Sequence, residues 1–278
     1  MTANRKLPAV LTIAGSDSGG GAGIQADLRT FSAFKVYGCS AITAVTAQNP
    51  DEVRRVDVLP GEAVKSQLEC VLKVFPVRFA KTGMLATREI IETVAEISRR
   101  YDLQLTVDPV MVSTSGARLL EEAAVSAMQE RLFPLAQWLT PNIPEAELIC
   151  RKTLKTPEDL AGAALMLYQQ YKCNVILKSG HAITPEKVTD TVCFQGKLFE
   201  LSSPTAEVQG NTAHGTGCTL SAALTANLAL GRSWQDSLAA AKAFVYGSLC
   251  ESASLSDAVF QMYPPNKNYF NQVSIKEL

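Results

Sequence analysis

The sequence has few histidines and no concentration of either charge. Only His181 and His214 occur among 278 residues, which argues against a metal site built on histidine. The net charge is −1 and no stretch gathers Lys and Arg, so we expect no nucleic-acid partner. No run approaches the roughly 20 apolar residues that a membrane span needs, and we expect no membrane association. The composition, 47% hydrophobic and 19% charged, indicates a globular chain with a sizeable core.

The chain also lacks CxxC pairs, and we expect no targeting segment. The apolar run Ala9–Ala14 is too short for the hydrophobic part of a signal peptide, and Asp17 follows it closely. An odd number of scattered cysteines is typical of reduced thiols that are buried as small apolar residues. We therefore expect a cytoplasmic protein. The seven cysteines stand at positions 39, 70, 150, 173, 193, 218 and 250.

Short β-branched runs alternate with longer helical patterns along the chain. This alternation is typical of an α/β fold, with a mainly parallel sheet covered by helices on both faces. No linker, repeat or low-complexity tract interrupts it, so we interpret residues 1–278 as one domain. The expected strands are Val10–Ala14, Ser40–Ala47, Arg78–Ala80, Leu103–Val107, Trp138–Leu139 and Val175–Leu177. The expected helices are Ile24–Phe34, Glu62–Val74, Arg88–Arg100, Glu121–Arg131, Pro144–Cys150, Pro157–Tyr171, Thr219–Leu230 and Trp234–Cys250.

Two local patterns refine this assignment. Thr156 followed by Pro157 and two acids is typical of a helix start: a cap, a proline at the first position, and carboxylates at the positive end of the dipole. Further on, Thr189–Phe194 and Leu198–Ser202 flank Gln195-Gly196-Lys197, which predicts an antiparallel hairpin.

Glycines and polar residues follow every expected strand of the parallel sheet. In open α/β sheets, ligands bind beyond the carboxyl ends of the strands, so we expect the functional site at this edge. The residues that follow the strands, in chain order, are Gly15–Asp17, Gln48–Asn49, Lys81–Met84, Asp108–Pro109, Thr140–Asn142 and Lys178–His181.

Two glycine-rich turns precede helical patterns near opposite ends of the chain. The turn Asn211–Cys218 runs into one helix, and Gly15–Gly23 precedes another. A helix that begins at such a turn leaves N–H groups unpaired beside the positive end of its dipole, which favours a bound phosphate. We therefore expect a phosphate and its acceptor between the two turns. The pattern G-x-x-x-x-G-K-[ST] is absent, which excludes a P-loop.

Each polar residue at this edge has a structural alternative beside the functional one. Asp108 either caps a turn or holds Mg²⁺. Asn142 and Glu145 are explained by a helix cap alone. Lys178 is either a solvated surface charge or, because it follows an apolar strand, a group that meets an anion, and we expect the anion. Cys218, at a helix N-terminus, should have a depressed pKa and act as base or nucleophile, or else it fills a place that needs a small side chain.

Taken together, these motifs resemble the hydroxymethylpyrimidine/phosphomethylpyrimidine kinases of thiamine biosynthesis, within the ribokinase-like superfamily. The resemblance covers about the first 250 residues. It implies a ribokinase-like three-layer αβα sandwich without a large separate lid domain. The stretches that carry it are Ala14–Asp27, Thr43–Asn49, Lys81–Leu85 and His214–Cys218.

The resemblance implies ATP- and Mg²⁺-dependent phosphorylation of 4-amino-5-hydroxymethyl-2-methylpyrimidine, and then of the monophosphate to the diphosphate. The implied substrate residues are Gln48 at the aminopyrimidine edge, with Gly15, Met84, Val110 and Asp27. The implied residues for Mg²⁺ and the nucleotide phosphates are Asp108, Glu145, Asn142, Lys178 and Thr216. The implied anion hole for the transferring group consists of Gly215, Thr216, Gly217 and Cys218.

Sugar kinases of the wider superfamily carry an aspartate base where Cys218 stands. A phosphomonoester has a second pKa of about 6, so the second phosphorylation needs no base at neutral pH, whereas the first attacks with a poorly acidic alcohol. We therefore expect Cys218→Ala to slow the first step more than the second. Two departures from the family pattern, Ala213 before His214 and Ser179 after Lys178, are expected to weaken nucleotide affinity.

Two other functions fit the same motifs. Pyridoxal kinases share the fold, and the amide of Gln48 can donate and accept toward either ring. A non-catalytic ligand-binding protein on a kinase fold is the other alternative, although Asp108, Lys178 and Gly217 argue against it.

Three further expectations concern assembly and mobile parts. The family makes a homodimer the expected assembly. The segments Ser113–Ala117 and Thr184–Val188 are the candidates for a loop that closes over the substrate. The tail from Asp257 to Leu278 has no counterpart in the resemblance, and we expect it to be disordered or to pack on a partner chain.

Overall fold

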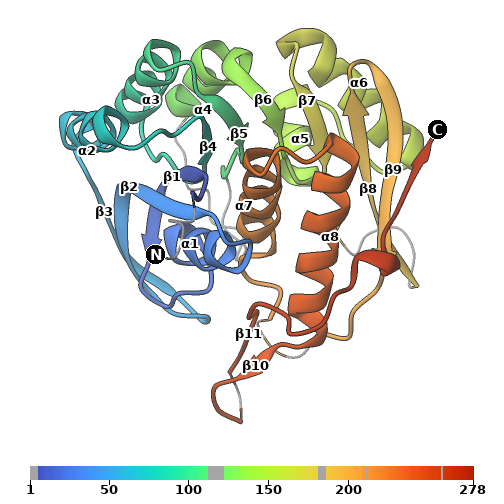
Figure 1. Cartoon of the computed structure of the whole chain (residues 1–278). Coiled ribbons are helices and arrows are strands. Elements are labelled where there is room, and N and C mark those ends of the chain that lie inside the picture. Colours follow the sequence, from blue (N-terminus) through green and yellow to red (C-terminus); the bar gives the residue numbers. More distant parts are fainter. Residues whose placement is uncertain (1–5, 112–121, 181–185, 209, 211, 258) are drawn as a thin grey trace.

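The structure is a computed structural model that describes residues 6–111, 122–180, 186–208, 210, 212–257 and 259–278. In this part of the chain one large sheet has ten strands (Figure 1). Their bounds, in sheet order, are β12 Ser274–Glu277, β9 Lys197–Pro204, β8 Lys187–Phe194, β7 Asn174–Leu177, β6 Ala136–Leu139, β5 Gln104–Val107, β4 Phe79–Thr82, β1 Ala9–Asp17, β2 Tyr37–Gln48 and β3 Val53–Val58.

The centre of the sheet is parallel and both of its edges are antiparallel. Strand β1 pairs in parallel with β2 and β4, and parallel pairing continues through β5, β6 and β7. Strands β3, β8, β9 and β12 pair antiparallel. The mainly parallel sheet is thus confirmed, and so is the hairpin, whose turn residues Gln195 and Gly196 both have positive φ.

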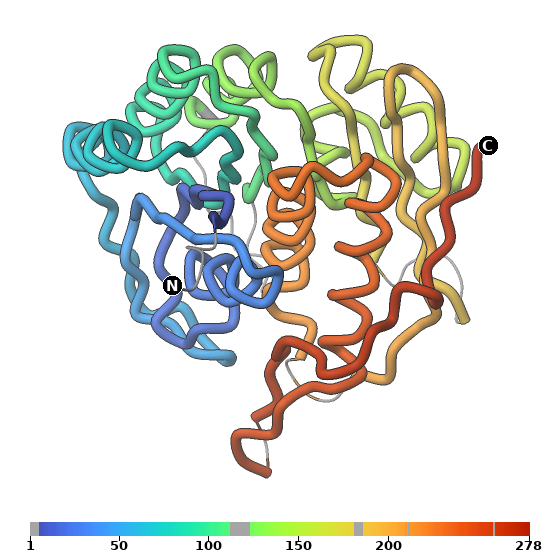
Figure 2. Tube along the Cα trace, in the orientation of Figure 1, coloured from blue at the N-terminus to red at the C-terminus, as the bar shows by residue number. Residues whose placement is uncertain are grey.

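Helices cover both faces of the sheet, which gives three layers (Figures 1 and 2). One face carries α1 (Gly23–Ala33), α7 (Thr216–Ala229) and α8 (Trp234–Cys250). The other carries α2 (Gly61–Val74), α3 (Arg88–Arg100), α4 (Glu122–Ala127), α5 (Ile143–Cys150) and α6 (Pro157–Tyr171). None of the described helices is both long and apolar enough to cross a bilayer.

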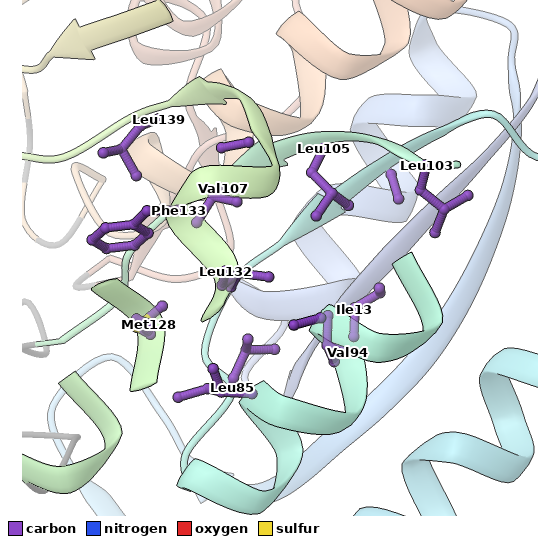
Figure 3. Close-up of a cluster of buried hydrophobic side chains, with 14 of the residues drawn as sticks. Ile13, Leu85, Val94, Leu103, Leu105, Val107, Met128, Leu132, Phe133 and Leu139 are labelled. Atoms are coloured by element: carbon purple, nitrogen blue, oxygen red, sulfur yellow. The ribbon is translucent and has the colours of Figure 1, made fainter. Parts of the chain in front are cut away.

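The largest hydrophobic cluster lies between the sheet and the α2–α6 layer (Figure 3). Ile13 of β1, Leu105 of β5 and Val94 of α3 are fully buried there. Burial on both faces explains why apolar residues predominate in β1, β6 and β7. At their carboxyl ends the chain changes to polar residues and glycine, and the site lies there.

Several helices begin and end near the residues expected from the sequence, and two differ from the expected bounds. Thr156 caps α6 with the expected capping box to Asp159. Helix α7 begins at Thr216 and not at Thr219, so the glycine-rich turn supplies the first turn of the helix. The helix expected over Glu121–Arg131 ends as α-helix at Ala127 and continues as a π-helical turn over Met128–Leu132, while Glu121 lies outside the described residues.

Strand β3 was not expected from the sequence, and β1 and β2 are longer than expected. All six residues of β3 are exposed, so it has no buried apolar face for a pattern to reveal. Strand β1 continues past Ala14 through an irregularity to Asp17. The extension carries the strand into the first glycine-rich turn.

The C-terminal tail was expected to be disordered or to pack on a partner chain, and disorder was wrong for the part of the tail that the structure describes. Strand β12 pairs with β9 of the same chain, with Ser274 opposite Ser202. Before it, the short strands β10 (Ala253–Ser254) and β11 (Phe260–Gln261) pair with each other. We call residues 253–278 the C-terminal arm. Figure 2 shows it running from this pair past the end of α8 to the edge of the sheet.

Candidate active site

A cavity of about 720 Å³ lies at the carboxyl ends of the central strands. Strands β2 and β4 lie on opposite sides of β1, and such a reversal of strand order opens a crevice at the sheet edge. Both glycine-rich turns border the cavity. The expected site residues that line it are Gly15, Gln48, Met84, Asp108, Val110, Asn142, Glu145, Lys178, Gly215, Thr216, Gly217 and Cys218.

The two glycine-rich turns touch each other through their backbones. Gly215 has φ +82°, and a Cβ on it would overlap the carbonyl oxygen of Gly21. Gly23 has φ +58°, and a Cβ there would overlap the carbonyl oxygen of Gly15. Both positions therefore require glycine for conformation and for close approach. We call the contact between Gly21 and Gly215 the glycine joint.

Helix α7 starts at this joint with Gly215 as its cap. Its first intrahelical bond runs from the Thr219 N–H to the Gly215 oxygen at 2.9 Å. The N–H groups of Gly217 and Cys218 therefore have no intrahelical acceptor, and they lie at the positive end of the dipole. A Cβ on Gly217 would lie 3.0 Å from Lys178 Nζ, so the ammonium stands against the same turn. This arrangement can hold a phosphoryl group.

Asp108 and Lys178 form an ion pair at the cavity wall. Lys178 Nζ lies 2.8 Å from Asp108 Oδ1, and the carboxylate also accepts from Thr140 and Ser221 hydroxyls, each at 3.3 Å. Burial raises the pKa of Asp108, but Lys178 and Lys81 outweigh it, and the pKa stays below its ordinary value. The carboxylate is therefore ionised at neutral pH.

Asn142 and Glu145 form a capping box at the start of α5. The Asn142 side chain accepts from the Glu145 N–H at 2.9 Å, and the Glu145 side chain accepts from the Asn142 N–H at 2.8 Å. The structural explanation is thus correct for both, yet both also line the cavity. Burial raises the pKa of Glu145 to about 7, although Lys178 lowers it.

Gln48 meets two groups that the sequence analysis did not assign to the site. Its Nε2 lies 3.2 Å from His214 Nε2, and that nitrogen lies 3.3 Å from Asp17 Oδ2. Asp17 also accepts from the N–H groups of Gly19 and Ala22, each at 2.8 Å. Burial raises the pKa of Asp17, but His214 and these N–H groups outweigh it and leave the pKa below its ordinary value.

The expected depressed pKa of Cys218 was wrong. Its thiol stands in the first turn of α7 and accepts a hydrogen bond from the Gly23 N–H at the start of α1. Burial nevertheless raises the pKa of the thiol above its ordinary value, and the lowering effect of Lys81 does not cancel it. Helix position alone favours thiolate, but loss of hydration opposes it more strongly.

Asp27 does not line the cavity, so the expected contact between Asp27 and the substrate was also wrong. Both its side chain and that of Lys81 are fully buried, and Lys81 Nζ lies 2.9 Å from Asp27 Oδ2. Thr12 donates to the same carboxylate oxygen at 2.6 Å. Lys81 itself borders the cavity. A salt bridge to a lysine 54 residues away was not visible from the sequence.

A smaller cavity, of about 110 Å³, adjoins the first one at Lys178 and Gly217. Val188, Leu220, Val245 and Leu249 supply apolar walls. A buried ion pair, Asp190 Oδ2 to Lys242 Nζ at 2.6 Å, lies at its border. Asp190 also accepts from the Ser179 N–H at 3.1 Å, and the Ser179 hydroxyl donates to the Thr189 oxygen.

The structure locates both departures from the family pattern, Ser179 and Ala213. Ser179 ties the end of β7 to β8, and Ala213 lines the large cavity beside His214. His181 and the loop Ser113–Ala117 lie outside the described residues, as do Thr184 and Pro185 of the other candidate loop.

No cluster of three or more His, Cys, Asp or Glu side chains that could hold a metal ion occurs in the described part of the chain. The acidic residues that line the cavity are Asp17, Asp108 and Glu145. Asp17 is engaged by His214 and by the N–H groups of Gly19 and Ala22, which leaves Asp108 and Glu145 as the candidates for Mg²⁺. Mg²⁺ bound beside substrate phosphates typically uses one or two carboxylates and several waters, so this donor set fits it.

Comparisons with known proteins identify the family of the chain. The family described as phosphomethylpyrimidine kinase matches residues 17–262. The hydroxymethylpyrimidine/phosphomethylpyrimidine kinase of Haemophilus influenzae is 46% identical over 244 residues, which cover 86% of this chain and 90% of that protein. The structure of phosphomethylpyrimidine kinase from Clostridium difficile 630 has a TM-score of 0.75 at 38% identity and covers 86% of this chain and 98% of its own.

A pyridoxal kinase is also similar in structure. The Staphylococcus aureus enzyme in complex with AMP-PCP and pyridoxal has a TM-score of 0.85 at 34% identity, and the match covers 99% of this chain and 100% of that one. The fold is ribokinase-like, as expected, and this chain belongs to the phosphomethylpyrimidine kinase family.

Proposed function

We propose that this protein transfers the γ-phosphoryl group of ATP to the hydroxymethyl group of 4-amino-5-hydroxymethyl-2-methylpyrimidine, and then phosphorylates the monophosphate to the diphosphate. One observation carries the proposal: a single cavity joins the amide of Gln48 to the first turn of α7, with Lys178 and Asp108 beside that turn. Family membership supplies the identity of the ring.

The pyrimidine lies against the β1–β2 side of the cavity in this proposal. The amide of Gln48 can both donate to a ring nitrogen and accept from the amino group. Met84 packs close to Gly15, since a Cβ on Gly15 would lie 2.7 Å from Met84 Cε, and these two with Val110 supply the apolar wall.

The transferring group lies over the start of α7. Phosphoryl transfer depends mainly on positioning and on stabilisation of charge. The N–H groups of Gly217 and Cys218 and the ammonium of Lys178 stabilise the negative oxygens, with Thr216 in the same turn. Asp108 holds Lys178 against the turn through its 2.8 Å contact.

Asp108 and Glu145 are the groups that would hold Mg²⁺, with Asn142 beside them. A bound Mg²⁺ would neutralise charge on the nucleotide phosphates. The smaller cavity suits the purine of ATP because its walls are largely apolar and it adjoins Lys178 and Gly217.

Cys218 keeps two roles in the proposal. A neutral thiol gives shape to the acceptor site, and its ionised form accepts the proton of the attacking hydroxyl group in the first step. Because the pKa of the thiol is raised, the base role should be small at neutral pH and grow with pH. The second step starts from an already ionised phosphate and needs no such base.

Pyridoxal is the second candidate substrate. The observation that favours it is the alignment with the Staphylococcus aureus pyridoxal kinase over 99% of this chain. A pyridine with a hydroxymethyl arm presents similar groups to Gln48 and to the start of α7.

We also propose that the protein acts in the cytoplasm as a homodimer. Val53, Val56 and Val58 of β3 and Val45 of β2 are exposed, at the edge where a second copy could cover them. Light scattering at low micromolar concentration tests this, and Val58→Glu, at a residue that does not line the cavity, should yield monomer if the edge is the interface.

The first experiment measures ADP release with Mg²⁺-ATP and, separately, hydroxymethylpyrimidine, its monophosphate and pyridoxal. Turnover of both pyrimidines with slower turnover of pyridoxal supports the proposal, and turnover of pyridoxal alone would make this a pyridoxal kinase.

Lys178→Met should lower kcat about a hundredfold or more, since it removes a charge beside the transferring group. Lys152→Met, which breaks the exposed pair with Asp159, is the matched control and should be unchanged.

A further inference from the structure

Gln261, in the C-terminal arm, lies against the glycine joint beside the active site. Gln261 of β11 is only 8% exposed, and no described group hydrogen-bonds to its Oε1, which is completely buried. A Cβ on Gly21 would lie 2.7 Å from that oxygen and 2.7 Å from His214 Cδ2. The amide of Gln261 and the ring of His214 therefore flank the same side of Gly21, at the glycine joint.

A buried amide oxygen without a partner destabilises the fold, and an apolar side chain of equal length would avoid that penalty. Stability therefore does not explain a glutamine at this place. Its neighbour Met262 packs with Ala206 and Leu249, which line the smaller cavity.

The arm is also anchored firmly enough to hold this side chain in place. The carboxylate of Glu251, just after α8, accepts from the Asn266 N–H at 2.8 Å and from the Tyr269 hydroxyl at 3.0 Å. Tyr269 packs edge-on against Tyr246, with ring centroids 5.5 Å apart. Strand β12 then completes the edge of the sheet beside β9.

Two contacts connect Gln261 to the substrate side of the cavity. His214, which it flanks, lies 3.2 Å from Gln48 and 3.3 Å from Asp17. Gly21 contacts Gly215, where α7 begins. A displacement at the joint would therefore move both the amide that reads the acceptor ring and the turn that receives the phosphoryl group.

We propose that Gln261 is a positioning residue for the acceptor: the arm holds its amide against Gly21 and His214 and thereby sets the place of His214 and Gln48 relative to the start of α7. The proposal rests on the function proposed above. It assigns to Gln261 a part in acceptor specificity.

The test is Gln261→Met, which keeps the length of the side chain and removes the amide. We expect kcat/KM for hydroxymethylpyrimidine to fall about tenfold or more, because small misplacements of reacting groups are costly. KM for ATP should stay within about twofold, since uniform nucleotide binding is untouched. The thermal midpoint should be unchanged or higher, because an unsatisfied oxygen is removed.

A purely structural role predicts the opposite signature, namely a lower thermal midpoint with unchanged kcat/KM for the pyrimidine, and that result would overturn the proposal. Gln272→Leu, on an exposed glutamine of the same arm, is the matched control and should leave all three quantities unchanged. If wild-type protein turns over none of the acceptors, the proposed function fails and not merely this inference.

If Gln261→Met folds poorly, a second variant tests the same proposal. Glu251→Ala removes the acceptor that anchors the arm, without touching the cavity. It should make the arm more accessible to protease and lower kcat/KM for the pyrimidine, in the same direction as Gln261→Met. A loosened arm with unaltered pyrimidine kinetics would also overturn the proposal.

Discussion

Lys81 and Asp27 form an ion pair in which neither side chain is exposed, with Nζ 2.9 Å from Oδ2. The pair lies beneath the cavity, and the ammonium carries charge close to the Cys218 thiol. Burial raises the pKa of Asp27, while the carboxylate of Asp27 keeps the pKa of Lys81 above its ordinary value despite burial. Removing either partner leaves an unpaired charge in the interior.

Lys81→Met should therefore lower the free energy of unfolding by about 3–5 kcal/mol. Urea denaturation measures this, with Lys152→Met as the control at an exposed pair that should cost no more than about 1 kcal/mol. Lys81→Met combined with Asp27→Leu should recover much of the loss. A single variant as stable as wild type would refute the importance of the buried pair.

Cys218 should react slowly with iodoacetamide at neutral pH and faster above about pH 9, because burial raises the pKa of its thiol. Alkylation of the Cys218 peptide, followed by mass spectrometry across this range, measures it. Lys81 lowers the pKa and Asp27 raises it, so Lys81→Met should move the profile to higher pH and Asp27→Asn to lower pH. A rate already at its plateau at pH 7 would contradict the raised pKa.

The same profile bears on catalysis. In wild type, kcat of the first phosphorylation should rise with pH as the thiol ionises, and Cys218→Ala should lose that rise. The second phosphorylation should be less affected by the substitution. Equal losses in both steps would leave Cys218 a purely structural role at the acceptor site.

Glu145 should make the protein less stable at pH 8 than at pH 5. Its pKa is about 7 in the folded protein against an ordinary value of 4.5, so its share of stability is complete below 4.5 and is lost as the pH rises through 7. The difference corresponds to at most about 3 kcal/mol of unfolding free energy. Thermal midpoints of chelator-treated protein measure it.

Glu145→Gln is the comparison for that measurement, because glutamine at this position still accepts in a capping box but does not ionise. The fall in midpoint from pH 5 to pH 8 should be smaller in this variant than in wild type. An identical fall in the two proteins would show that Glu145 does not titrate in this range.

A comparison of Gly215→Ala with Gly231→Ala separates the cost of a positive φ from the cost of a steric overlap with a neighbouring backbone. Both glycines have positive φ, +82° and +76°, so alanine costs about 1–2 kcal/mol at either. A Cβ on Gly231 meets nothing within 4 Å, whereas one on Gly215 overlaps the Gly21 oxygen. Gly231→Ala should remain active, and Gly215→Ala should be less stable and lose activity. Equal effects of the two on stability and on ADP release would mean that the glycine joint has no special role.

The alternation of strands and helices was predictable because burial on both faces requires apolar strands and amphipathic helices, and these patterns are local. The polar residues at the strand ends were predictable for the same reason, as Gln48, Asp108 and Lys178 interrupt apolar runs. The capping box of Thr156 depends on residues only three positions apart. By contrast, β3 has no buried face, so no apolar pattern marks it in the sequence, and it is defined by its pairing with β2.

The sequence by itself determined the fold class, the two glycine-rich turns and most of the cavity wall, since each depends on residues close together in the chain. Only the tertiary structure decided the contacts between distant residues. It placed Asp27 on Lys81 instead of substrate, raised the pKa of Cys218 by burying it, and brought His214 to Asp17 across 197 positions. It also returned the C-terminal arm to the glycine joint, because hydration and close contact depend on the whole fold and not on the order of neighbours.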